Sequence, residues 1–62
     1  QPEVSALRRA DGSVLYRVEG AGICTEHQQF WQAATHFHAL CSSKGIECAP
    51  PIEPEAHEQD QP

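Results

Sequence analysis

The sequence predicts a small α+β protein in which an antiparallel β-hairpin packs on one amphipathic α-helix and a disordered acidic tail follows. Three observations predict this class. An Asp-Gly pair lies between two runs that carry apolar residues, residues 25–44 have a helical apolar period, and the end of the chain is rich in proline and acid. We therefore expect one domain over residues 1–49 and a Pro-rich acidic tail over residues 50–62.

The predicted hairpin spans residues 4–19 and turns at Asp11 and Gly12, because Asp-Gly between two apolar-bearing runs is a strong hairpin signal. A two-residue turn there would pair Leu7 with Tyr16. Since alternate residues of a strand point to the same face, this register predicts one buried face and one face that exposes arginines. The expected buried residues are Leu7, Val14, Tyr16 and Val18.

The predicted helix spans residues 25–44 and follows a Gly-Ala-Gly turn at residues 20–22. Thr25 suits the N-cap, and Gly45 suits the position after the last turn. At about 100° per residue, the apolar side chains form one stripe that we expect to pack on the hairpin. The stripe consists of Phe30, Ala33, Ala34, Phe37, Leu40 and Cys41, with Trp31 and His38 on its flank. The solvent side carries Gln28, Gln29, Gln32, Thr35, His36 and Ala39.

The end of the chain changes in character after residue 45. Residues 46–49 are long enough for a short third strand beside the hairpin. Pro50 and Pro51 then stop regular structure, and the remaining composition is typical of disordered chain. Residues 49–62 contain four acidic residues and no Lys or Arg, so the acidity of the chain belongs mostly to this tail.

Charge and hydropathy argue against nucleic acid and membranes as partners. The formal net charge is −5, and the nearly neutral body lacks the basic surface that nucleic acid binding requires. No apolar run approaches the roughly 20 residues of a membrane span. The three cysteines are an odd number, which favours a reducing compartment over a disulfide framework. We therefore expect a soluble, cytoplasmic protein with no membrane partner, and nucleic acid is the least favoured of the partner classes that stay open.

The length of 62 residues makes stability marginal, because a chain this short buries only about 60% of the surface that its unfolded form exposes. A disulfide, a metal ion or a second copy of the chain is expected to supply the missing stability. A homodimer is the simplest of these solutions, formed either through the apolar flank of the helix around Trp31 or through an unpaired edge of the hairpin.

Histidine and cysteine residues leave a zinc site as the alternative. His38 and Cys41 share a helical face, and Cys48 with Cys24 or His27 would complete a tetrahedral set. However, the chain has no C-x-x-C pair, and the same cysteines suit small buried apolar positions. A Cys41–Cys48 disulfide is also possible, but no sequence motif indicates it. We therefore expect no cofactor and keep zinc as the alternative.

The sequence contains no recognised catalytic signature, so we expect no enzyme activity. It favours a small interaction module that binds and modulates, or inhibits, a macromolecular partner, and we expect this partner to be a protein. Aromatic and arginine side chains dominate the energetics of such interfaces. The contact candidates are Trp31, Phe30, Tyr16, Arg8 and Arg17, although the aromatic ones also suit core positions. A third interpretation is nucleic acid binding through the Arg8 and Arg17 face of the hairpin.

Overall fold

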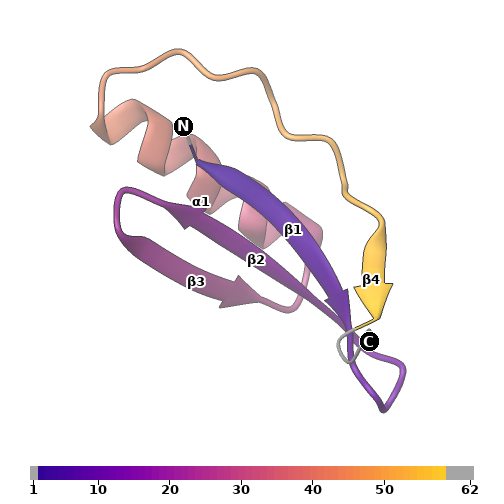
Figure 1. Cartoon of the computed structure of the whole chain (residues 1–62). Helices are drawn as coiled ribbons and strands as arrows, with labels where there is room; N and C mark the ends of the chain where they lie inside the picture. Colours follow the sequence, from indigo (N-terminus) through magenta and orange to yellow (C-terminus); the bar gives the residue numbers. More distant parts are fainter. Residues whose placement is uncertain (1, 59–62) are drawn as a thin grey trace.

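A computed structural model describes residues 2–58, which form one helix packed on a four-stranded mixed sheet (Figure 1). The sheet order is β3-β2-β1-β4, in which the first three strands are antiparallel and β4 runs parallel to β1. The α+β class, the first hairpin and the amphipathic helix are thus confirmed. The elements are β1 (Glu3–Arg8), β2 (Val14–Gly20), β3 (Ile23–His27), α1 (Phe30–Ser43) and β4 (Ala56–Glu58).

The turn between β1 and β2 contains three residues rather than the predicted two. Arg9 N–H donates to Ser13 O at 2.8 Å, and Gly12 N–H donates to Arg9 O at 3.0 Å. Gly12 has a φ of +91°, a value that favours glycine. A three-residue loop that ends in such a residue is a common hairpin connection, and it moves the register by one residue.

This register changes which side chains of β1 face the helix. Leu7 pairs with Leu15 on the face away from α1, so its predicted burial beside Val14, Tyr16 and Val18 is wrong. Ala6 takes the inner position instead and is buried. The reason is that a shift of one residue moves every side chain of a strand to the opposite face.

β3 occupies residues that we expected to lead into the helix. Gly20 pairs with Ile23, and the two residues between them, Ala21 and Gly22, have φ values of +56° and +77°. Two positive φ values define the type I′ turn of a tight hairpin. Thr25 therefore lies in the middle of a strand, and its predicted role as a helix N-cap is wrong.

The third strand is thus β3, and the prediction of a strand over residues 46–49 is wrong. These residues have no regular structure, because Cys48 is tied to the helix rather than to the sheet. At the other end of the chain, Pro2 is buried against Gly20. A Cβ atom on Gly20 would lie 2.9 Å from Pro2 Cα, so this close approach requires glycine.

α1 begins later than predicted, because β3 takes up the residues before it. Gln29 is the N-cap, and its N–H donates to Gln32 Oε1 at 3.1 Å, as in a capping box. Gly45 follows the helix as predicted, with a φ of +69°. Ile46 N–H donates to Cys41 O at 3.1 Å and closes the last turn in a Schellman arrangement.

The core lies between the apolar stripe of α1 and the inner face of the sheet. Its buried residues are Ala6, Val18, Ala33, Phe37 and Cys41. Around them lie the partly buried side chains of Val4, Tyr16, Leu40 and Cys48. His36, which we expected on the solvent side, is half-buried because its ring packs 5.4 Å from that of His27 on β3.

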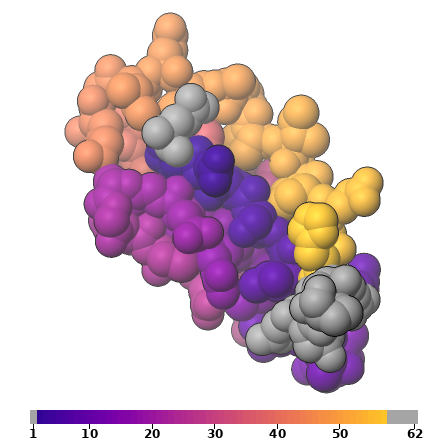
Figure 2. Space-filling model, viewed as in Figure 1, coloured from indigo at the N-terminus to yellow at the C-terminus, as the bar shows by residue number. Residues whose placement is uncertain are grey.

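The segment after the helix has a defined course, in contrast to the disorder predicted from residue 50. Residues 46–58, which we call the strap, run along the outer side of β1 and end in β4 (Figures 1 and 2). There Ala56 pairs with Ala6. The part of the predicted tail over residues 59–62 lies outside the described residues.

Candidate functional site

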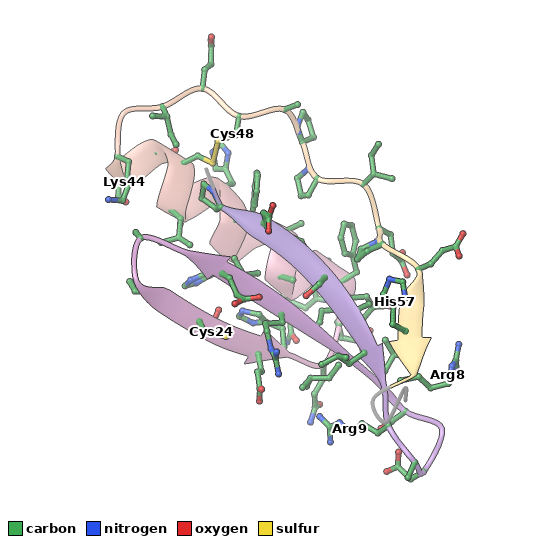
Figure 3. The ribbon with its side chains drawn as sticks, in the orientation of Figure 1. Arg8, Arg9, Cys24, Lys44, Cys48 and His57 are labelled. Atoms are coloured by element: carbon green, nitrogen blue, oxygen red, sulfur yellow. A yellow bond between two sulfur atoms is a disulfide. The ribbon has the colours of Figure 1, made fainter. Side chains whose placement is uncertain are left out.

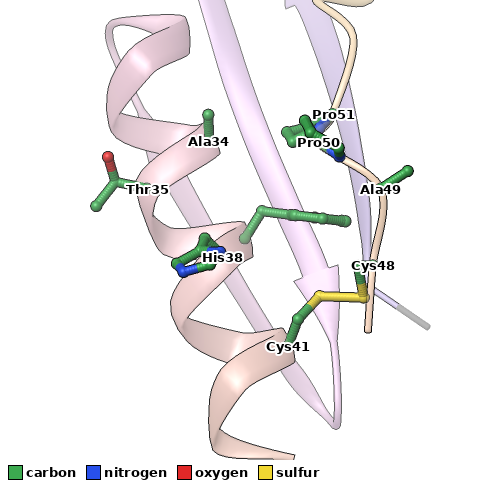
Figure 4. Close-up of a pocket in the computed structure, with 9 residues that line it drawn as sticks. Ala34, Thr35, His38, Cys41, Cys48, Ala49, Pro50 and Pro51 are labelled. Carbon is green, nitrogen blue, oxygen red and sulfur yellow. A yellow bond between two sulfur atoms is a disulfide. The ribbon is translucent and has the colours of Figure 1, made fainter. Parts of the chain in front are cut away.

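A groove of about 490 Å³ lies between α1 and the strap (Figure 4). The helix contributes Ala34, Phe37 and His38 to its walls, while Pro50 and Pro51 lie across from them on the strap. These side chains are mostly apolar, and the proline rings offer no N–H donor. The groove therefore suits apolar groups of a ligand, with the His38 imidazole as a polar contact.

A disulfide between Cys41 and Cys48 crosses one end of this groove (Figure 4). The two Cα atoms are 6.3 Å apart, within the usual range for a disulfide. Cys41 lies in the core on α1, whereas Cys48 is half-buried on the strap. The bond thus fixes the strap to the helix at the point where the groove begins.

Trp31 extends the apolar surface beyond the groove toward the start of the helix. It precedes Ala34 and His38 by three and seven residues, a spacing that places the three side chains on one helical face. Its side chain is 66% exposed, and Thr35 Oγ1 donates to the Trp31 carbonyl at 2.9 Å. The structure therefore leaves the largest side chain of the chain in contact with solvent.

Phe30 and Tyr16, two other predicted contact residues, pack against each other instead. Their rings meet edge to face with centroids 5.8 Å apart, and both side chains are half-buried. Tyr16 Oη donates to Glu53 Oε2 of the strap at 2.9 Å. This hydrogen bond to a carboxylate raises the pKa of Tyr16 above its ordinary value. The hydrogen bond between Tyr16 and Glu53 is thus a second attachment of the strap, in addition to the disulfide.

The two predicted arginine contacts lie away from Trp31. Arg17 is on the face of β2 opposite the helix, where its Nη2 lies 3.4 Å from Glu26 Oε2 of β3. Arg8 is at the end of β1, in register with Glu58 (Figure 3). The five predicted contact residues therefore do not form one continuous surface.

The five candidate zinc ligands are also separated. Cys41 and Cys48 share a disulfide, so their sulfur atoms are not thiolates. Cys24 is an exposed thiol on β3, whereas Cys48 lies apart from it on the strap, bonded to α1 (Figure 3). His27 Nε2 lies 2.9 Å from Thr25 Oγ1, while His38 is exposed on α1. Among residues 2–58, no group of three His, Cys, Asp or Glu side chains could hold a metal ion.

Sequence reasoning missed the strap wall of the groove, formed by Cys48, Pro50 and Pro51. Two signals pointed toward it: the Cys41–Cys48 spacing allowed a disulfide, and the two prolines that follow are apolar. Neither signal indicates where the chain lies relative to the helix, which depends on the distant pairing of β4 with β1.

Comparison with known proteins adds no functional assignment. No protein-family model, no curated protein and no solved structure matches the chain. Within the described part of the chain, no helix is long and apolar enough to cross a membrane.

Proposed function

We propose that the protein is a small, non-enzymatic interaction module that binds another protein through Trp31 and the groove beside it. By occupying the surface of that protein it would modulate it, as an inhibitor or an accessory subunit. The observation that carries this proposal is the exposed Trp31 in line with an apolar groove, because Trp is the residue most enriched at the centres of protein interfaces.

The magnitude of the apolar effect at Trp31 supports an interface. A Trp side chain offers roughly 150–250 Å² of surface, and removing two thirds of it from water is worth about 3 kcal/mol at about 25 cal/mol per Å². The fold leaves this part of the Trp31 surface in water, although few side chains are buried in the core within residues 2–58. A partner that covers Trp31 would recover it as binding free energy.

The charges around the groove favour a basic partner. The strap carries exposed carboxylates at Glu47, Glu53 and Glu55, and no Lys or Arg occurs in residues 46–58. A partner that places an apolar side chain in the groove and Lys or Arg at its rim would be complementary in both respects. The acidic residues of the strap would then contribute electrostatic attraction as well as shape.

A displayed library of random peptides, selected against the oxidised chain, tests this proposal. We expect enriched peptides to combine an apolar anchor with Lys or Arg, and their affinity to fall at least tenfold for Trp31→Ala. Ile23→Ala is the matched control, because Ile23 is also exposed but lies on β3 at the far edge of the sheet. Selected peptides that bind Trp31→Ala as tightly as the parent chain would refute the assignment.

Self-association is a second part of the proposal, and the free edge of the sheet supports it. β3 is an edge strand, and the exposed Ile23 lies at its start. In an antiparallel ladder the hydrogen-bonded pairs alternate, so the closing pair of Gly20 and Ile23 leaves the backbone groups of Cys24 and Glu26 directed outward. A second β3 could pair there and join two sheets into one.

The mass of the native protein in solution tests this second part. A metal-free dimer supports self-pairing at β3, and a monomer refutes it. A monomer that carries one zinc ion and unfolds when a chelator is added would support the zinc alternative instead.

The disulfide also bears on the location of the protein. The odd number of cysteines led us to expect a cytoplasmic protein, whereas the Cys41–Cys48 bond is typical of proteins that meet an oxidising compartment. We therefore propose that the chain spends at least part of its life in such a compartment. Cells are quenched in acid, and thiol labelling of the extracted chain then measures the fraction of Cys41 and Cys48 that is oxidised. A mostly oxidised pair supports the oxidising compartment, and a mostly reduced pair supports the cytoplasm.

A further inference from the structure

Beyond the Ile46 N–H that closes the last turn of the helix, three described contacts of different strength hold the strap on the body of the protein. The disulfide between Cys41 and Cys48 is covalent, the Tyr16 hydrogen bond reaches Glu53, and β4 pairs with β1 over three residues. The first lies at the groove, and the other two lie further along the strap. The course of residues 46–52 beside the helix therefore depends mainly on the disulfide.

The remaining contacts of this stretch are weak. Ile46, Glu47, Ala49 and Pro50 are exposed, Ile52 is 89% exposed, and besides Cys48 it is Pro51 that is half-buried, in the wall of the groove. Proline residues offer no N–H for pairing with a neighbouring strand. A single exposed hydrogen bond such as that of Tyr16 adds little net stability, and a three-residue parallel strand is short by the usual standard.

We propose that the Cys41–Cys48 disulfide is a redox latch: its reduction releases the strap from α1 and removes one wall of the groove. Partner binding at Trp31 and the groove would then require the oxidised chain. This consequence for binding rests on the function proposed above, whereas release of the strap does not.

The chemistry of release follows from the exposure of the two cysteine residues. Attack is expected at Cys48, which is half-buried, rather than at Cys41, which is only 3% exposed. A thiolate of a dithiol reductant attacks Cys48 Sγ, the sulfur–sulfur bond breaks, and Cys41 leaves as a thiolate. The second thiol of the reductant then displaces Cys48 and closes a cyclic disulfide. The two protons lost by the thiols of the reductant end on Cys41 and Cys48, and two electrons pass to the protein as the reductant is oxidised to its disulfide.

Release has two structural consequences that a measurement can separate. Phe37 is covered by the strap at the groove, so its ring should become exposed when the strap leaves. β1 should lose its parallel neighbour, because β4 pairs with it over three residues at the far end of the strap. The antiparallel pairs among β1, β2 and β3 do not involve the strap and should persist.

Amide hydrogen exchange of the ¹⁵N-labelled full chain, with and without dithiothreitol, tests the latch. Cys24→Ala serves as the background, because it removes the exposed free thiol. We expect reduction to accelerate exchange at least tenfold for residues 56–58, while the amides of β2 keep their protection. The triple variant that adds Cys41→Ala and Cys48→Ala should show the fast exchange with or without dithiothreitol.

Unchanged exchange of residues 56–58 after complete reduction would overturn the latch, whatever the partner. The peptides selected above provide the binding measurement, and we expect their affinity to fall at least tenfold on reduction in the Cys24→Ala background. Peptides that bind the oxidised and reduced chains equally would overturn the control of binding. If the selection yields no peptide that depends on Trp31, the proposed function fails, but the exchange data still decide whether the strap is released.

Discussion

Removal of the Cys41–Cys48 disulfide should cost this protein a large share of its stability. The bond joins residues seven positions apart, and the chain-entropy relation for a loop of that size gives about 2.5 kcal/mol at 25 °C. A domain of this length has a free energy of unfolding of only about 3–9 kcal/mol. The Cys41→Ala/Cys48→Ala variant should therefore remain folded only by a small margin.

Urea unfolding followed by far-UV circular dichroism measures this loss. With a dependence on urea of about 1 kcal/mol per molar, the midpoint should fall by about 2.5 M. The matched control is Cys24→Ala, which removes an exposed thiol without a cross-link and should change the free energy of unfolding by less than about 0.5 kcal/mol. Reduced wild-type protein keeps all three sulfur atoms and should lose the same amount as the double variant.

The result that refutes this reasoning is a loss below about 0.5 kcal/mol for both the double variant and the reduced protein, since the entropic term alone is several times larger. An equal loss in Cys24→Ala would refute it in another way. It would show that removal of a thiol, rather than of the cross-link, is what destabilises the fold.

Three further predictions concern single side chains. Ala21→Asn should raise the thermal unfolding temperature by a few degrees, because Asn-Gly suits the two positive φ values of the β2–β3 turn; no rise would contradict the turn type. Trp31→Ala should change the free energy of unfolding in urea by less than about 1 kcal/mol, whereas Phe37→Ala should lower it by about 3–5 kcal/mol, and equal losses would place Trp31 in the core. The chain has one tyrosine, so absorbance at alkaline pH should show the pKa of Tyr16 above 10.0 and its return toward that value in Glu53→Ala. Because this folded-state pKa is raised, the stability from the Tyr16 hydrogen bond should be present below pH 10 and decline as pH rises through the folded-state pKa, a decline that Tyr16→Phe removes.

Local sequence signals were sufficient for the elements whose contacts are close in the chain. Asp11-Gly12 located the first hairpin, the apolar period located the helix, and Gly45 marked its end. The register was wrong by one residue, because Asp-Gly is compatible with both two- and three-residue loops. The free-energy difference between those loops depends on which face becomes buried, and that is a property of the packed structure.

Longer-range features were not predictable from local patterns. β3 was missed because Thr25 with Glu26 resembles a helix start, and the competing type I′ turn requires Ala21 to adopt a positive φ that alanine rarely takes. The strap was assigned to disorder from residue 50 onward because prolines and acids dominate that part. Its position depends on the Cys41–Cys48 disulfide, which the spacing allowed but no motif selected, and on the pairing of β4 with β1 at the other end of the chain, which leaves no local signature.

The pairing of β4 with β1 also bears on the order in which the protein assembles. Ala6 and Ala56 are fifty positions apart, whereas the two hairpins close over loops of two and three residues. Closing the longer loop costs about 2.5 kcal/mol more in chain entropy, so the strap is expected to dock after the hairpins and helix have formed. Until then the edge of β1 is bare, and another chain could add a strand to it. Early oxidation of Cys41 and Cys48 would shorten that interval by holding the strap near its final position.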